Sequence, residues 1–303
     1  MRLPRSPIAP QVRLERPSGR PLPLVLRAFR GSFNRGPEAM QDFARRAASK
    51  TIVERVPELV ARYPDGRVFH APAGDRMYAQ VFILGEYEPE VSAAMRRLLR
   101  PGDLAVDVGA NHGWYSVLMG NAVGPSGRVW AVEPLPPLLA ELRRNVGSNP
   151  SLPIEVKEIA LGAEDGELEV HLFEGLPHGH ASASTLGRDD YESFKAPMKT
   201  LDGIAGDERP ALIKIDVEGG EREVLRGAQR LLAADTAPIV MLEVNHETSA
   251  AFGYEPRELI DLLPGYEVWR AEHGGLERET EPASAPHGAT WVCVPPGRRD
   301  RLS

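Results

Sequence analysis

The stretch that decides the fold is Ala105-Val-Asp-Val-Gly-Ala-Asn-His-Gly113. A short apolar run ends there in an acid, and the chain then turns through Gly109, Asn111 and Gly113 into an apolar segment over residues 114–119. This pattern predicts a strand, a tight loop and a helix, with glycines where the backbone must approach a ligand closely.

A second apolar run, Arg128-Val-Trp-Ala-Val132, predicts a neighbouring strand that ends in Glu133. An acid at the tip of the second strand is suited to hydrogen bonding with the two hydroxyls of a ribose. The dinucleotide fingerprint would require glycine at positions 109, 111 and 114, but Asn111 and Trp114 stand at the last two. The spacing therefore favours another adenosine ligand, S-adenosylmethionine (SAM), over NAD.

Downstream, short apolar runs alternate with segments of helical periodicity, which is typical of a parallel sheet with helices on both faces. We expect strands at residues 68–69, 80–84, 104–108, 129–132, 154–159, 168–172, 212–215, 239–244, 266–270 and 290–294, and helices at 37–63, 88–99, 138–146 and 224–232. The strand at 168–172 alternates apolar and polar residues, so we expect one of its faces to be wet. The last two strands are expected to pair as a closing hairpin.

Composition excludes several classes of function. The 303 residues carry 36 basic and 43 acidic side chains, and this net charge of −7 argues against general nucleic-acid binding. The single cysteine, Cys293, allows no disulfide within the chain, which is consistent with a reducing cytoplasm. Because no apolar stretch approaches the roughly 20 residues that span a bilayer, we expect a cytoplasmic protein with no membrane span.

The chain resembles the FkbM family of SAM-dependent methyltransferases, within the class I methyltransferase superfamily. The segments that carry the resemblance are Tyr87-Glu-Pro-Glu-Val91, Pro101-Gly-Asp103, Asp107–Gly113, Ala131-Val-Glu-Pro134, Ile159-Ala-Leu-Gly162, Thr200-Leu-Asp202, Ile213-Lys-Ile-Asp-Val-Glu-Gly219 and Met241-Leu-Glu-Val244. The resemblance implies a Rossmann-like α/β fold with a seven-stranded, mostly parallel sheet. It also implies SAM as cofactor and methyl transfer to a hydroxyl oxygen of a small-molecule, glycan or lipid acceptor; the residues alone would also permit nitrogen.

The resemblance divides the chain into three parts. Residues 76–297 are expected to form the methyltransferase domain. Residues 1–75 carry no match and are expected to form an N-terminal extension, poorly ordered where it is rich in proline and then helical over 37–63. Residues 298–303 are expected to form a flexible tail.

Polar residues gather where the predicted strands end, and open α/β sheets bind ligands at that edge. We expect an adenine ring to lie against Ala160 and Leu161, at the end of the third strand. The predicted cofactor-binding residues are Asp107, Gly109, Asn111, Gly113, Glu133, Ala160, Leu161 and Asp216.

Catalysis would require a base, because the methyl group of SAM is already activated and an alcohol is a poor nucleophile while protonated. By position, Glu218 and His246 are the candidate bases, and Asp216 is the third candidate catalytic residue. Glu218 could instead cap the following helix, and His246 could be a surface residue. Lys214 lies two residues before Asp216, on the same face of its strand, so we expect it to pair with an acid.

A metal-dependent mechanism is the alternative, because Asp216, Glu243 and Asn245 offer the oxygen ligands that Mg²⁺ prefers. Val244 interrupts the acidic and amide pair, so we favour a mechanism without metal. The serine-rich segment at 175–190 is either a lid over the site or a plain connection. Two other functions remain open: an oxidoreductase linked to NAD or a nucleotide sugar, and a scaffold with a SAM-binding fold but no catalysis.

Overall fold

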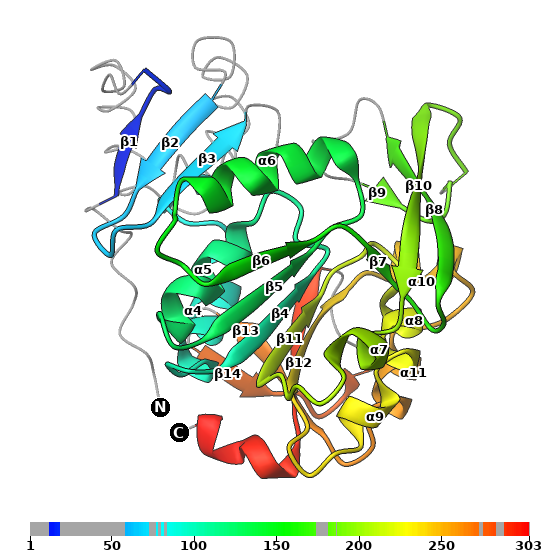
Figure 1. The fold of residues 1–303 in the computed structure, drawn as a ribbon. Coiled ribbons are helices and arrows are strands. Elements are labelled where there is room, and N and C mark those ends of the chain that lie inside the picture. The colour runs from blue at the N-terminus through cyan, green and yellow to red at the C-terminus, as the bar shows by residue number, and fades with distance from the viewer. Residues whose placement is uncertain are drawn as a thin grey trace, which may run out of the picture.

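The structure, a computed structural model, contains a large central sheet and two smaller sheets that flank helix α6 (Pro136–Gly147) in Figure 1. The residues that it describes are 12–18, 58–72, 77, 80–81, 84–173, 181–185, 187–272, 275–282 and 288–302. Within these residues, no helix combines the length and the apolar character that crossing a membrane requires.

The central sheet has eight strands in the order β14-β13-β15-β12-β11-β4-β5-β6. Its members are β4 (Leu104–Val108), β5 (Arg128–Val132), β6 (Ile154–Lys157), β11 (Leu212–Ile215), β12 (Ile239–Val244), β13 (Glu267–Glu272), β14 (Gly275–Arg278) and β15 (Ala289–Val294). The five strands from β6 to β12 are parallel, and β15 is antiparallel to both β12 and β13. The predicted α/β fold with a mostly parallel sheet is confirmed, and β14 adds an edge strand to the seven that were expected.

Helices cover both faces of this sheet, and this explains why its central strands are apolar on both sides. One face packs against α4 (Pro89–Leu98), α5 (Trp114–Val123) and α6. The other packs against α7 (Leu201–Ala205), α8 (Glu221–Arg226), α9 (Gln229–Leu232) and α11 (Arg257–Asp261), while α10 (His246–Ala251) follows β12. The helix predicted over 224–232 is therefore two short helices, although its apolar residues are buried as expected.

An insertion between β6 and β11 forms the sheet β7-β10-β8-β9. Its strands are β7 (Ala160–Leu161), β8 (Gly166–Phe173), β9 (Ala181–Ser182) and β10 (Tyr191–Lys199). The prediction of one strand over 154–159 was wrong at its end, because the chain leaves the central sheet after Lys157 and then pairs with β10. On β8, Glu167 and Glu169 are exposed as expected, whereas His171 is buried against the ring of Tyr191.

The N-terminal sheet consists of β1 (Arg13–Glu15), β2 (Glu58–Arg62) and β3 (Val68–Pro72), all antiparallel. The helix predicted over 37–63 is wrong for residues 58–63, of which 58–62 form β2, and residues 37–57 lie outside the described residues. The strand predicted at 80–84 is also wrong, because its described residues are helical.

Asn145 of α6 and Asn149, which follows this helix, attach the N-terminal sheet to the main domain. The Asn145 side chain accepts from the His70 amide and donates to the His70 carbonyl, and it also donates to the carbonyl of His112 in the β4–α5 loop. The Asn149 side chain bonds the amide and the carbonyl of Val68 in the same way. The backbone N–H and C=O groups of Val68 and His70, at the edge of β3, are thus satisfied by these two side chains.

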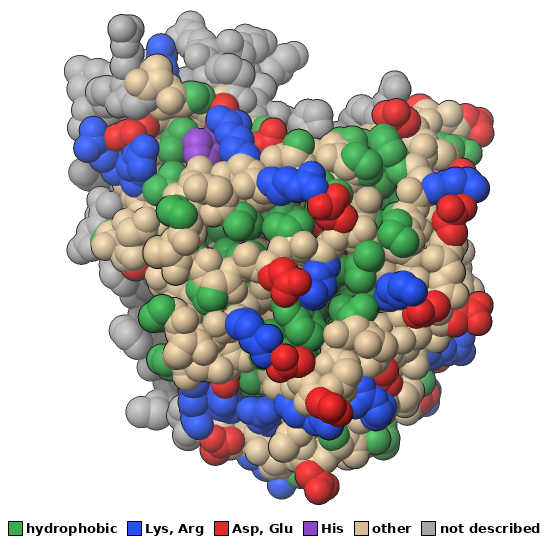
Figure 2. Space-filling view, in the orientation of Figure 1, with side chains coloured by type: hydrophobic (Ala, Val, Ile, Leu, Met, Phe, Trp, Pro, Cys, Tyr) green, Lys and Arg blue, Asp and Glu red, His purple; other side chains and the backbone are tan. Residues whose placement is uncertain are grey.

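Residues 298–302 lie in helix η2 (Pro296–Leu302), not in the flexible tail that the sequence predicted. Arg301 is buried there and donates to both carboxylate oxygens of Asp103, at 2.6 and 3.1 Å. On the face seen in Figure 2, acidic and basic side chains of the described residues are interspersed.

Candidate functional site

A cavity of about 380 Å³ lies at the carboxyl ends of β4, β5, β11 and β12, and the insertion sheet closes one side of it. This volume is in the usual range for a small-molecule site. Of the residues predicted to form the site, the cavity is lined by Gly109, Asn111, Glu133, Ala160, Leu161, Asp216, Glu218, Glu243 and Asn245.

The β4–α5 loop lines the cavity through Gly109, Ala110 and Asn111. Three residues of this loop, Gly109, Asn111 and Gly113, have a left-handed backbone. A Cβ on Gly109 would lie 1.9 Å from the carbonyl oxygen of Asp216, so this glycine lets the loop cross the end of β11. A Cβ on Gly113 would lie 2.6 Å from Leu142 Cδ1. Gly113 therefore serves the packing of α5 on α6, and it is not part of the cavity lining.

Asp107 also lies outside the cavity lining, fully buried beneath the loop. Its Oδ2 accepts a hydrogen bond of 2.6 Å from the Ser116 hydroxyl. Burial raises the pKa of Asp107, and the nearby Lys214 ammonium opposes that rise. Asp107 is thus linked electrostatically to Lys214, and its role in cofactor binding stays a prediction.

Glu133 ends β5 at the edge of the cavity, as the sequence predicted. Its Oε2 accepts from the amide of Asn111 at 2.9 Å, and its Oε1 accepts from the amide of Leu135 at 3.0 Å. Burial raises the pKa of Glu133 to about 7, against the lowering effect of these two bonds. The carboxylate is therefore fixed in orientation and titrates near neutral pH.

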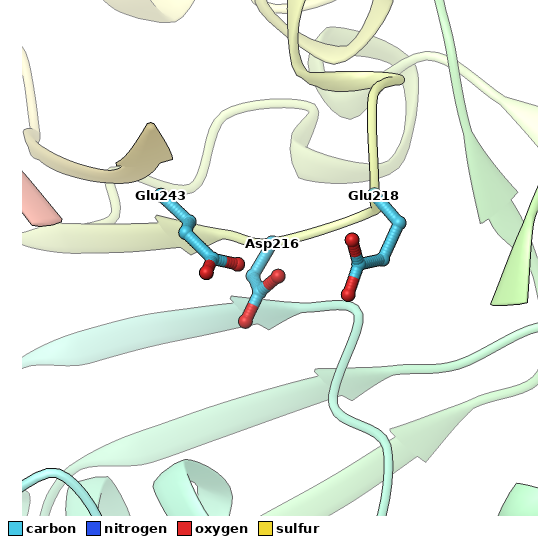
Figure 3. Close-up of side chains that lie close together, drawn as sticks. All are labelled: Asp216, Glu218 and Glu243. Carbon is cyan, nitrogen blue, oxygen red and sulfur yellow. The ribbon is translucent and has the colours of Figure 1, made fainter. Parts of the chain in front are cut away.

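Three carboxyl groups meet at the other end of the cavity, from Asp216, Glu218 and Glu243 (Figure 3). One oxygen of each lies within 4.8 Å of the others. Lys214 lies beside them, as expected, with its Nζ 2.9 Å from Asp216 Oδ2 and 4.7 Å from the centre of the Tyr115 ring. The predicted convergence of the fourth and fifth strand ends is thus present.

The environments of these groups separate their pKa values. The Asp216 carboxylate, burial and a hydrogen bond to Asp216 raise the pKa of Glu243 to about 10. Burial and the charges of Asp216 and Glu221 raise the pKa of Glu218 to about 8. Burial would lower the pKa of Lys214, but the carboxylates of Asp216 and Asp107 outweigh it and raise that pKa. At neutral pH, Glu243 is therefore protonated and Lys214 is charged.

The remaining predicted residues have other places. His246 is exposed at the start of α10 and does not line the cavity. Asn245 lines it, but its Oδ1 caps α10 by accepting from the amides of Glu247 and Thr248. The N-cap residue of α8 is Gly220, and Glu218 lines the cavity two residues before it.

Sequence reasoning missed two acids near this site. Glu88 has a left-handed backbone, with φ of 40°, and accepts from the Tyr115 hydroxyl at 2.6 Å. Glu221 is buried and accepts from the amides of Val217 and Gly219. Glu88 lies inside one of the segments that carried the family resemblance, and that was the available signal. Glu221 gave no such signal, because acids commonly occupy the first turn of a helix.

Comparison with known proteins gives a family match. The family model described as the methyltransferase FkbM domain matches residues 107–274. Hexuronic acid methyltransferase AglP of Haloferax volcanii is 26% identical over 169 residues, which cover 53% of this chain and 61% of AglP. AMB antimetabolite synthetase AmbE of Pseudomonas aeruginosa is 27% identical over 233 residues, which cover 63% of this chain and 10% of AmbE.

The chain thus spans less than two thirds of the length of either of these relatives. Among solved structures, it is similar to the methyltransferase FkbM from Methylobacillus flagellatus KT. The two share 18% sequence identity and a TM-score of 0.41, over 71% of this chain and 52% of that one.

Proposed function

This chain belongs to the FkbM family of SAM-dependent methyltransferases, and from that premise we propose that it methylates a hydroxyl oxygen of a small-molecule or glycan acceptor. The observation that carries the proposal is the group of three carboxyls beside the β4–α5 loop. A hydroxyl must lose its proton as it attacks, so oxygen methylation needs a base at this point.

The cavity fits SAM at its other end. Each oxygen of Glu133 accepts one backbone N–H and keeps a lone pair, so the carboxylate can accept from two ribose hydroxyls as well. The apolar side chains of Leu135, Ala160 and Leu161 line the cavity next to Glu133, where they would contact an adenine ring. We therefore propose that Glu133 and these apolar residues hold the nucleoside.

Bound SAM supplies a methyl group that its sulfonium charge makes electrophilic. We assign removal of the acceptor proton to Glu218, because a base whose pKa lies near the working pH is the most effective. Asp216 is already engaged by the Lys214 ammonium, and protonated Glu243 donates to it. These two carboxyls are left to orient the acceptor, and we assign no step to the exposed His246.

We favour a mechanism without metal, because the Lys214 ammonium lies 2.9 Å from Asp216 and already offsets negative charge there. In the metal-binding set first considered, the Asn245 oxygen is used in capping. In a metal-dependent mechanism Glu218 would replace Asn245 as a ligand, since the carboxyls of Asp216, Glu218 and Glu243 lie close enough together to hold a cation. Metal dependence is the second candidate, and it is tested directly by chelation.

A panel of acceptors tests the oxygen assignment. Glucuronic acid, catechol and glucosamine would be incubated with the protein and SAM, with S-adenosylhomocysteine measured and the methylated atom located by NMR. Similarity to AglP, a hexuronic acid methyltransferase, motivates the choice of glucuronic acid. We expect methyl ethers, and we expect Glu218→Gln to lower turnover by ~10²-fold or more while exposed Glu247→Gln stays at the wild-type rate. Methylation confined to nitrogen would overturn the proposal.

A further inference from the structure

The turn that carries Glu218 has a backbone that its own sequence does not favour. Glu218 has a φ of 52°, and Gly219 follows with a φ of 110°. A left-handed conformation in a residue other than glycine costs about 1–3 kcal/mol, so the surrounding structure must hold it. The turn matters because it directs the Glu218 side chain toward Asp216 and Glu243, as Figure 3 shows.

The Glu221 carboxylate holds this turn from the inside. Its Oε1 accepts from the amide of Val217 at 3.0 Å and from that of Gly219 at 3.2 Å, the two amides on either side of Glu218. Only 4% of Glu221 is exposed, so these bonds are shielded from water. A single oxygen thus fixes the backbone before and after the residue assigned as base.

The other oxygen of Glu221 ties this turn to the segment that follows the neighbouring strand. Glu221 Oε2 accepts from the hydroxyl of Tyr254 at 2.9 Å, and Tyr254 is itself buried, with the Arg222 guanidinium 4.7 Å from its ring centre. Tyr254 lies between α10 and α11, and α10 begins two residues after the end of β12, which carries Glu243. Glu221 therefore links the two parts of the chain whose acids meet in the cavity.

From this geometry we infer that Glu221 is a positioning residue, which keeps the Glu218 carboxylate beside Asp216 and Glu243 through the amides of Val217 and Gly219. The inference rests on the proposed role of Glu218 as base. Ser182 of β9 also stabilises this turn, because its hydroxyl donates to the Glu218 carbonyl at 2.8 Å.

Removal of the Glu221 carboxylate would leave two buried amides without their acceptor, at ~1–3 kcal/mol each if no other partner is found. The turn can recover those bonds only by changing conformation, and the Glu218 carboxylate would then move. A displacement of about 1 Å can cost 10²-fold in rate. Glutamine in place of Glu221 keeps an acceptor oxygen for both amides and can still bond Tyr254.

The test uses the full chain with whichever acceptor of the hydroxyl panel it methylates. Glu221→Ala should lower kcat by ~10²-fold and change the Kd for SAM by less than threefold, since Glu133 is untouched. Glu221→Gln should recover most of the lost rate. The matched control is Glu223→Ala, which removes a carboxylate of the same helix that pairs with Arg222 and Arg226.

A double variant separates this inference from the proposed function. If Glu221 acts through Glu218, adding Glu221→Ala to Glu218→Gln should cost no further rate. Multiplying losses would overturn the inference, as would a kcat for Glu221→Ala within threefold of wild type. Amide hydrogen exchange adds a readout without acceptor: Val217 and Gly219 should exchange faster in Glu221→Ala, and unchanged protection would also overturn it. Wild-type turnover in Glu218→Gln would instead refute the assignment of the base.

Discussion

The substitution Glu133→Gln tests how the nucleoside is held. The carboxylate accepts from the amides of Asn111 and Leu135, one on each oxygen, and the ribose would add its hydroxyls to the same two oxygens. Glutamine replaces one oxygen by an NH₂ group, which would face a backbone donor and a ribose donor. A hydrogen bond to a charged group contributes ~1.5–3 kcal/mol, so we expect the Kd for SAM to rise by roughly 10- to 100-fold.

The pKa of Glu133 gives this prediction a second, independent readout. Burial raises that pKa from 4.5 to about 7, which means that the folded protein favours the neutral form. The contribution of this group to stability is therefore greatest below pH 4.5, declines as the pH rises toward 7 and is constant above it. Ribose hydroxyls favour the charged form, so SAM binding near pH 6.5 should lower the pKa and release a fraction of a proton.

Isothermal titration calorimetry measures both quantities. Titrations of SAM at pH 6.5 in buffers of different ionisation enthalpy should show proton release for the wild type and none at this site for Glu133→Gln. The control is Glu155→Gln, which changes an exposed carboxylate of the neighbouring strand β6. A Kd within twofold of wild type for Glu133→Gln, with proton release unchanged, would refute the assignment of Glu133 to the ribose.

Three further predictions concern the acids and the N-terminal sheet. The wild-type kcat should rise with pH through about 8, as Glu218 loses its proton. Lys214→Met should move the midpoint of the pH–rate profile upward, because the Lys214 ammonium lowers the pKa of Glu218. An unmoved midpoint would contradict this. Turnover should be unchanged when EDTA is added. If EDTA abolished turnover and Mg²⁺ restored it, the three carboxyls would be assigned as metal ligands. Asn145→Ala removes three buried hydrogen bonds, so denaturant titration should show unfolding ~3 kcal/mol easier.

The sequence predicted the central sheet well because its parallel strands are buried on both faces. An apolar run such as 212–215 between polar segments has few other interpretations. The error at 58–62 has the opposite cause. Val60 fits the helical spacing of the preceding residues, but the strand is selected by its pairing with the neighbouring β3 and with the distant β1. β3 is in turn held by Asn145 of α6 and by Asn149, which follows that helix, and no local pattern contains that information.

The same difference applies to the site, where some features follow from the sheet and others depend on distant residues. The meeting of Asp216 with Glu243 was predictable, because parallel strands end at one edge of the sheet. Glu221 was not, since its function depends on a left-handed turn and on Tyr254, which lies 33 residues away. For Gly109 the need for glycine was predicted but its main reason was not, because the closest obstacle is the backbone of Asp216.

The three carboxyls of the site also show why residue types alone cannot assign their roles. Asp216 lies between an ammonium and a protonated acid, from Lys214 and Glu243, and both donate to it. Glu243 keeps its proton because Asp216 is charged beside it, and so it cannot act as a base near neutral pH. Burial and the charges of Asp216 and Glu221 raise the pKa of Glu218 to about 8, and the Lys214 ammonium opposes that rise. Lys214 also pairs with Asp216, so the assignment of the base depends on Lys214 as well as on Glu218.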